Sequence, residues 1–130
     1  MTLLTREVAL TQEHFAIEKV DVTEWGTIDP ETGKPEPTYV YVRELSAKEK
    51  DAFETSLVSG TGKKQKINLE NFRARLAVLV CCDENRLPIF RSEDVERLTQ
   101  KPVKVLSRIA EVAKRLNDLS DEDEEELLKN

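Results

Sequence analysis

The sequence predicts a helix-dominated α+β fold in which an N-terminal β-hairpin packs on a bundle of four to five α-helices. Two observations support this. Residues 15–25 and 37–45 alternate apolar and polar side chains on either side of a loop rich in Gly and Pro, which is typical of a hairpin. From Ser46 onwards the apolar residues recur at helical spacing instead. A lone hairpin is marginal in water, so its apolar face needs the helices as a cover.

The hairpin is expected to have one buried and one exposed face. In the first run, Val20 and Val22 alternate with polar neighbours, and in the second the valines and the tyrosines occupy opposite faces. The loop GTIDPETGKPEP (26–37) is dense in Gly, Pro and charge, so it interrupts any regular element. The two runs therefore form an antiparallel pair joined by a long turn.

Four helices should follow, and each begins at a residue suited to a helix start. Ser46 and Glu49 have the spacing of a capping box, and this first helix should end near residues 59–62. The other three starts are Asn68, Ser92 and Pro102. The second helix, 69–82, is expected at the centre of the fold, and the last ends at Asn117. The apolar stripes of these two helices are Leu69, Phe72, Leu76, Leu79 and Val80, and Val105, Leu106, Ile109, Ala113 and Leu116. Ser120 can cap a last acidic helix or precede a frayed tail.

Charge is distributed unevenly along the 130 residues. Residues 121–130 carry −5 of the formal −6, which leaves residues 1–120 nearly neutral. We therefore predict a single domain over 1–120 followed by an acidic C-terminal tail over 121–130. A nearly neutral body with a negative tail is a poor match for nucleic acid, which is bound mainly through Lys and Arg.

The N-terminal stretch 2–14 mixes Leu and Val with polar residues and predicts no regular element. Arg6 and Glu7 interrupt its apolar residues, so it does not have the pattern of a signal peptide. No stretch approaches the roughly 20 apolar residues that a membrane span needs. We therefore expect a cytoplasmic protein without a membrane partner, whose thiols stay reduced.

The two cysteines, Cys81 and Cys82, lie in the most apolar part of the chain. If both are helical, they point about 100° apart and cannot form a disulfide without distortion. No His or basic residue lies within four positions except Arg86, and apolar surroundings raise a thiol pKa. We interpret the pair as packing residues in the core or in an interface, in preference to a nucleophile.

For each of the other candidate sites, a purely structural role is favoured over a functional one. The acidic run 121–126 lacks the Gly and the ligand spacing of an EF-hand loop, so a solvated tail is favoured over a cation site. His14 has no catalytic partners in the sequence pattern. The loop SGTGKK (59–64) lacks the spacing of a phosphate-binding loop. We therefore expect no catalytic residue, no metal site and no cofactor.

The densest positive and negative clusters suggest a self-association hypothesis. Lys63, Lys64 and Lys66 on one copy would meet the acidic tail of the next and favour head-to-tail assembly. Such exposed contacts are weak singly and are screened by salt. The alternative is that both clusters only keep the protein soluble.

The order of segments resembles the tail assembly chaperones of long-tailed bacteriophages and prophages. The similarity runs from about residue 3 to about residue 120. Its most specific pieces are the Val-x-Val-x-x-Trp-Gly strand, the Val-Arg-Glu-Leu-Ser-x-x-Glu junction, the Asn-Phe-Arg-Ala-Arg helix and the closing Leu-Asn-x-Leu-Ser. Two features depart from the pattern. The hairpin loop is longer than usual, and Arg86 stands where a Gly often follows Asp-Glu-Asn.

The resemblance implies a non-enzymatic role in the bacterial host cytoplasm. Proteins of this family bind the tape measure protein, keep it soluble and help the tail tube to polymerise, and they are absent from the mature virion. Many also occur in a longer, frameshifted form whose extension is thought to recruit the major tail protein. The alternative function is a small phage morphogenesis adaptor or structural protein retained in the particle. An acidic DNA mimic is disfavoured, because its acids would be spread over the folded body.

Two sets of residues are candidates for contact with a client or with another subunit. Val78, Cys81 and Cys82 lie on the far side of the apolar stripe of the second helix, although core burial is the favoured reading for each. Leu127 and Leu128 follow the acidic run and have no obvious core to enter. The expected partners are thus the tape measure protein, the major tail protein through a longer form, and other copies of this chain.

Overall fold

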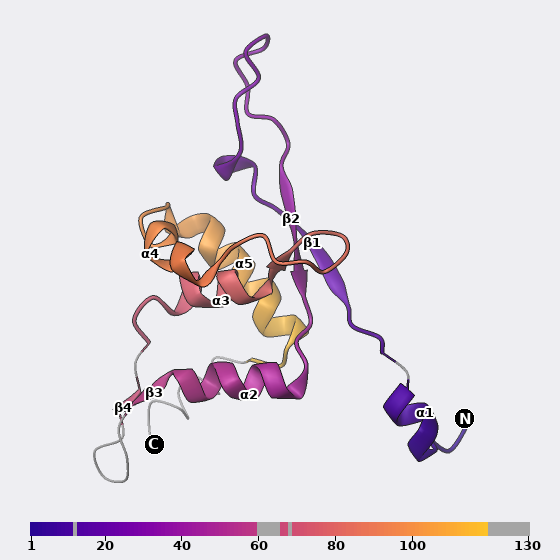
Figure 1. The fold of residues 1–130 in the computed structure, drawn as a ribbon. Coiled ribbons are helices and arrows are strands. Elements are labelled where there is room, and N and C mark those ends of the chain that lie inside the picture. The colour runs from indigo at the N-terminus through magenta and orange to yellow at the C-terminus, as the bar shows by residue number, and fades with distance from the viewer. Residues whose placement is uncertain (12, 60–65, 68, 120–130) are drawn as a thin grey trace.

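The computed structural model describes residues 1–11, 13–59, 66–67 and 69–119, and it has the α+β fold that the sequence predicts. These residues form a three-stranded antiparallel sheet, a second sheet of two short strands and five α-helices (Figure 1). The α-helices are α1 (Arg6–Thr11), α2 (Ala47–Ser56), α3 (Phe72–Val80), α4 (Val95–Leu98) and α5 (Val103–Leu116). The strands are β1 (Ile17–Asp21), β2 (Tyr39–Arg43), β3 (Val58–Ser59), β4 (Lys66–Ile67) and β5 (Cys81–Cys82). Two short 3₁₀ helices, η1 (Thr23–Trp25) and η3 (Ser92–Asp94), complete the elements.

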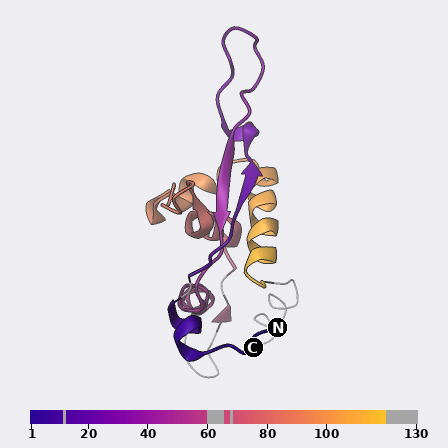
Figure 2. The ribbon, with the colours of Figure 1, turned by 90° about the vertical axis from the view of Figure 1, so that its right-hand side faces the viewer.

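The predicted hairpin is confirmed. Strands β1 and β2 pair antiparallel from Ile17 opposite Arg43 to Asp21 opposite Tyr39. The valines of both strands face inward and are buried, whereas Tyr39 and Lys19 lie on the exposed face with the ammonium 4.3 Å from the ring centre. Helices α3 and α5 lie side by side on the buried face (Figures 1 and 2). The hairpin therefore has the cover that its apolar face requires.

A tight turn follows β1, where Trp25 and Gly26 precede the loop. Thr38 lies against Gly26 so closely that a Cβ at position 26 would overlap its hydroxyl oxygen. Trp25 packs against the core, and its ring meets Phe90 edge to face at 6.3 Å. The hairpin beyond this point projects away from the helices (Figure 1). Glycine is thus required at position 26 by the close approach of the two hairpin arms.

Helices α2 and α5 follow the sequence pattern, although α2 ends at Ser56, before the predicted end near residues 59–62. The Ser46 hydroxyl accepts from the Glu49 N–H, and the Glu49 carboxylate accepts from the Ser46 N–H, which confirms the capping box. Helix α5 buries its predicted stripe except for the partly buried Leu116, and it ends at Asn117. Asp118 then adopts a left-handed conformation (φ 53°), and the Leu119 N–H donates to the Lys114 carbonyl over 2.8 Å. This is a Schellman-type helix end.

The predicted helix 69–82 is wrong at both ends. It begins at Phe72, after Asn71 at the N-cap position, and ends at Val80; Asn68 lies outside the described residues. Cys81 and Cys82 form strand β5 and pair with Val42 and Tyr41 of β2. The backbone changes to strand here because the outer edge of β2 offers ladder hydrogen bonds that a helix continuing past Val80 would leave unmade.

Arg86, which stands where the family often has Gly, lies in the turn after β5. Arg86 has φ 65°, a left-handed conformation in which glycine carries no steric cost. Its side chain compensates for the strain, because its guanidinium lies 4.5 Å from the ring centre of Phe15 and donates to the Glu44 carbonyl over 3.0 Å. The predicted cap at Ser92 is off by one residue. Arg91 holds the N-cap position, and the Asp94 carboxylate accepts from its N–H.

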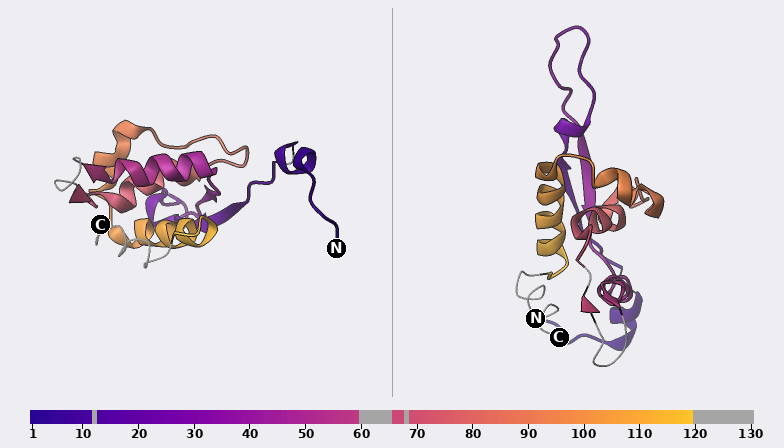
Figure 3. Two further views of the ribbon diagram at one scale, coloured as in Figure 1. Left: turned by 90° about the horizontal axis from the view of Figure 1, so that it is seen from below. Right: turned by 90° about the vertical axis from the view of Figure 1, so that its left-hand side faces the viewer.

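A helix that the sequence pattern did not predict, α1, forms near the N-terminus. Its start resembles an N-cap, since the Thr5 hydroxyl accepts from the Val8 N–H over 3.3 Å. No residue of α1 is buried. It lies apart from the sheet and the other helices (Figures 1 and 3).

Candidate functional site

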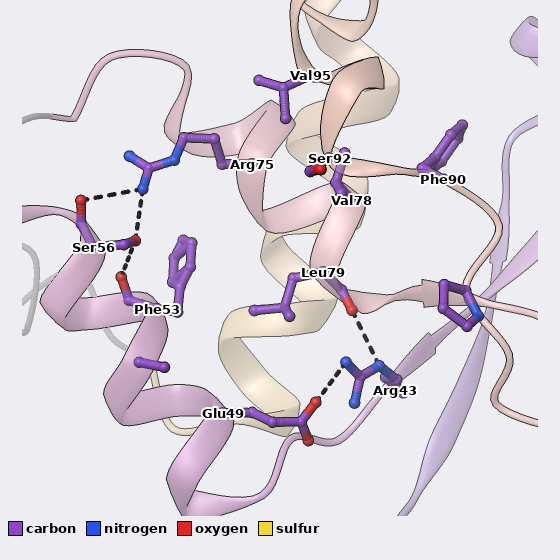
Figure 4. Close-up of a pocket in the computed structure, with 12 residues that line it drawn as sticks. Arg43, Glu49, Phe53, Ser56, Arg75, Val78, Leu79, Phe90, Ser92 and Val95 are labelled. Atoms are coloured by element: carbon purple, nitrogen blue, oxygen red, sulfur yellow. Dashed lines mark hydrogen bonds and ion pairs between the residues drawn. The ribbon is translucent and has the colours of Figure 1, made fainter.

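An open groove of about 540 Å³ lies between α2 on one side and α3 with the segment 88–95 on the other (Figure 4). Most of its lining is apolar. The residues around it are Arg43, Glu49, Ala52, Phe53, Ser56, Arg75, Val78, Leu79, Pro88, Phe90, Ser92 and Val95. Three separate parts of the sequence thus build one apolar surface.

Arg43 closes one end of the groove. Its Nε donates to the Leu79 carbonyl over 3.1 Å, which satisfies a carbonyl near the end of α3, and one terminal nitrogen bonds the Glu49 carboxylate over 2.8 Å (Figure 4). The Arg43 guanidinium is the main reason that the pKa of Glu49 falls to about 2. One arginine of the sheet therefore ties α2 to α3.

Arg75 closes the other end. It reaches from α3 to α2, where it donates to the carbonyl and to the hydroxyl of Ser56 at 3.2 and 2.6 Å. Its guanidinium lies 5.9 Å from the ring centre of Phe53, and Phe53 meets Phe72 at 5.6 Å. Among the described residues no carboxylate pairs with Arg75. Within the described residues, this end of the groove therefore carries a positive charge that no carboxylate pairs with.

Asn117 joins the end of α5 to the chain just before α2. It is buried, and its carbonyl oxygen accepts from the Leu45 N–H over 2.6 Å. Its amide nitrogen donates to the carbonyls of Arg43 and Ala113 at 3.3 and 3.0 Å. The end of α5 is thus fastened to the junction between β2 and α2. The sequence indicated Asn117 only as a helix end.

The predicted contact residues are placed very differently. Val78 is partly buried and lines the groove. Cys81 and Cys82 are free thiols and are fully buried, so neither side chain is exposed on the surface of this chain. Burial raises the pKa of Cys81 to about 12 and also raises the pKa of Cys82. The packing interpretation of both cysteines agrees with this placement.

The structure describes no side chain of the other candidate contact residues. Lys63, Lys64, Leu127 and Leu128 lie outside the described residues, and only the backbone of Lys66 is described, in β4. The self-association hypothesis for these residues remains a prediction.

The sequence analysis missed most of the groove. Phe90, Ser92 and Val95 come from a segment with no strong pattern, and Ala52 lies on a helix of weak amphipathicity. The available signals were Val78, which was a predicted contact residue, and Phe53, a large apolar residue on an otherwise charged helix.

The arrangement is suited to binding an apolar segment. An apolar floor with charged ends can accept the apolar face of an amphipathic helix or an extended segment. In the described part of the chain, no cluster of three or more His, Cys, Asp or Glu is placed to hold a metal ion. None of the described helices has the length and apolar character to cross a membrane.

Comparison with known proteins agrees with the resemblance in the sequence. The family described as phage tail assembly chaperone matches residues 4–129, which is nearly the whole chain. Comparisons with curated proteins and with solved structures gave no match. The family match covers both the hairpin and every helix that frames the groove. The chain therefore belongs to the phage tail assembly chaperone family.

Proposed function

We propose that this chain binds the tape measure protein of its phage, keeps it soluble and promotes assembly of the tail tube around it. The protein acts in the host cytoplasm as a non-enzymatic chaperone and is released before the virion matures. Membership of the tail assembly chaperone family supports this role. The groove between α2 and α3 is the proposed client site.

The apolar lining of the groove is the observation that carries this proposal. Val78 and Leu79 form its floor, and Phe53 and Phe90 stand on opposite sides (Figure 4). A tape measure protein is long and mostly helical, so it presents apolar side chains at i, i+3, i+4 and i+7. Several copies along one client would let weak single contacts hold it through avidity.

Co-expression with the tape measure protein tests the proposal. We expect the client to become soluble and to co-purify with the wild-type chain. Ala52→Glu should abolish co-purification, because it places a charge in the apolar groove from an exposed helix position. Ala47→Glu is the matched control, since Ala47 is also exposed on α2 but does not line the groove.

Two results would contradict the proposal. The client could stay insoluble beside a folded wild-type chain, or Ala52→Glu could co-purify as well as Ala47→Glu. Mass spectrometry of purified virions separates a chaperone from an adaptor that is retained in the particle, because only the adaptor would be found there. We further propose that a longer, frameshifted form brings the major tail protein to the complex, which pull-down with that form tests.

A further inference from the structure

The N-terminal arm (residues 1–11) exposes an apolar surface that nothing in the described chain covers. Leu3, Leu4, Val8 and Leu10 are exposed by 91%, 65%, 50% and 66%. Helix α1 has only six residues, and such a short helix is not stable in water unless its apolar face packs on something. Figures 1 and 3 show α1 standing clear of the body. The arm therefore has the character of a docking element.

The described residues between the arm and β1 lead away from the sheet and the other helices. The Glu44 N–H donates to the Ala16 carbonyl over 2.8 Å, which extends the β1–β2 ladder one step beyond Ile17. Arg86 holds the next residue, Phe15, by stacking on its ring and bonding the Glu44 carbonyl. The chain before β1 thus continues in the direction of the strand. An arm directed away from its own helices can reach the groove of a second copy.

We propose that the arm of one copy occupies the groove of a second copy until the client displaces it. This inference rests on the proposed function, because it places the arm and the client in the same groove. Leu4, just before the Thr5 cap, and Val8, inside α1, both expose apolar side chains that the apolar floor can accept. Glu7 supplies the carboxylate that Arg75 lacks among the described residues.

The exchange would regulate the groove. A free groove and a free arm are both apolar surfaces exposed to water, and covering each with the other protects the chaperone from nonspecific association. A client that presents many binding segments competes with the arm by mass action and avidity.

Sedimentation equilibrium of the full chain without any client tests the exchange. We expect the mass of the wild-type chain to rise above the monomer value of 14.9 kDa with concentration. Leu4→Asp/Val8→Asp in the arm and Ala52→Glu in the groove should each weaken self-association by about tenfold or more. All three positions are exposed, so these variants should keep the wild-type circular dichroism spectrum. Thr2→Asp/Thr5→Asp and Ala47→Glu are the matched controls and should associate like the wild type.

Mixing the two weakened variants gives the decisive result. The arm variant keeps an intact groove and the groove variant keeps an intact arm, so an equimolar mixture should form a 1:1 heterodimer that neither forms alone. The proposal is overturned if the wild type stays monomeric, if either variant associates like its control, or if the mixture contains only monomers. A monomeric wild type would mean that the arm does not bind a second copy. The arm would then bind the groove of its own chain or the client. No client is present, so failure here leaves the co-purification test of the proposed function untouched.

Discussion

Replacing Asn117 with Ala should destabilise the protein more than its place at a helix end would suggest. Its buried side-chain amide makes three hydrogen bonds, of which two join the end of α5 to the chain just before α2 and one goes to Ala113 within α5. Alanine fits the helix geometry but makes none of these bonds. The Leu45 N–H would then lie buried without an acceptor.

The expected loss is about 2–3 kcal/mol. An unpaired buried N–H costs about 1–3 kcal/mol. The carbonyl of Ala113 loses less, because it still accepts from the Asn117 backbone N–H over 3.0 Å. With a urea m-value of about 2 kcal/mol/M for a domain of this size, the unfolding midpoint should fall by about 1–1.5 M.

Equilibrium unfolding in urea, followed by far-UV circular dichroism, measures this loss. Asn85→Ala is the matched control, because Asn85 is exposed in the turn after β5 and should change the midpoint little. A midpoint for Asn117→Ala within about 0.3 M of wild type, at unchanged m-value, would refute the claim that Asn117 braces α2.

Three further predictions concern the helix end, the thiols and the groove. Asp118→Gly should raise the free energy of unfolding by about 0.5–1 kcal/mol, because Asp118 has a positive φ that glycine adopts freely; a lower urea midpoint would contradict this. Cys81 and Cys82 should not react with a thiol reagent at pH 8 until urea unfolds the chain. At this pH a pKa of about 12 leaves about one Cys81 side chain in ten thousand as the reactive thiolate. Stoichiometric labelling of the native protein within minutes would contradict this prediction. The lowered pKa of Glu49 stabilises the fold above pH 4.5, and this contribution disappears as the pH falls toward 2. Because Glu49 is partly exposed, the effect should be about 1 kcal/mol, and Glu49→Gln should flatten the stability profile between pH 5 and 2.

The sequence predicted the elements that depend on local patterns. Val20 and Val40 revealed the hairpin through alternation, and the Ser46–Glu49 capping box and the stripe of α5 marked two helices. These signals are local because one face of each element is buried and the other is exposed. Such a difference leaves a clear period in the residues themselves.

The errors occur where tertiary contacts decide the conformation. Cys81 and Cys82 continue the apolar run of α3, yet the free edge of β2 draws them into a strand. Helix α1 has no buried face, so burial imposed no period on its residues. The groove could not be predicted because it depends on the spacing between α2 and α3, which Arg43 and Arg75 set across distant parts of the chain.

The most specific pieces of the family resemblance hold the hairpin and the helices around the groove in place, and they supply few of the residues that line it. Gly26 allows the hairpin arms to close, Arg43 and Arg75 tie α2 to α3, and Asn117 fixes the start of α2. Each acts through hydrogen bonds or close packing, which tolerate little change in side-chain shape.

The apolar lining lies mostly outside those segments. Ala52, Val78, Phe90 and Val95 meet the groove through van der Waals contact alone, and apolar residues of similar size can replace one another at moderate cost in stability. A chaperone built this way can keep its frame while its lining changes to match a different client. Exchanging these four residues should therefore alter which client is bound while leaving the fold intact, whereas exchanging the frame residues should cost stability first.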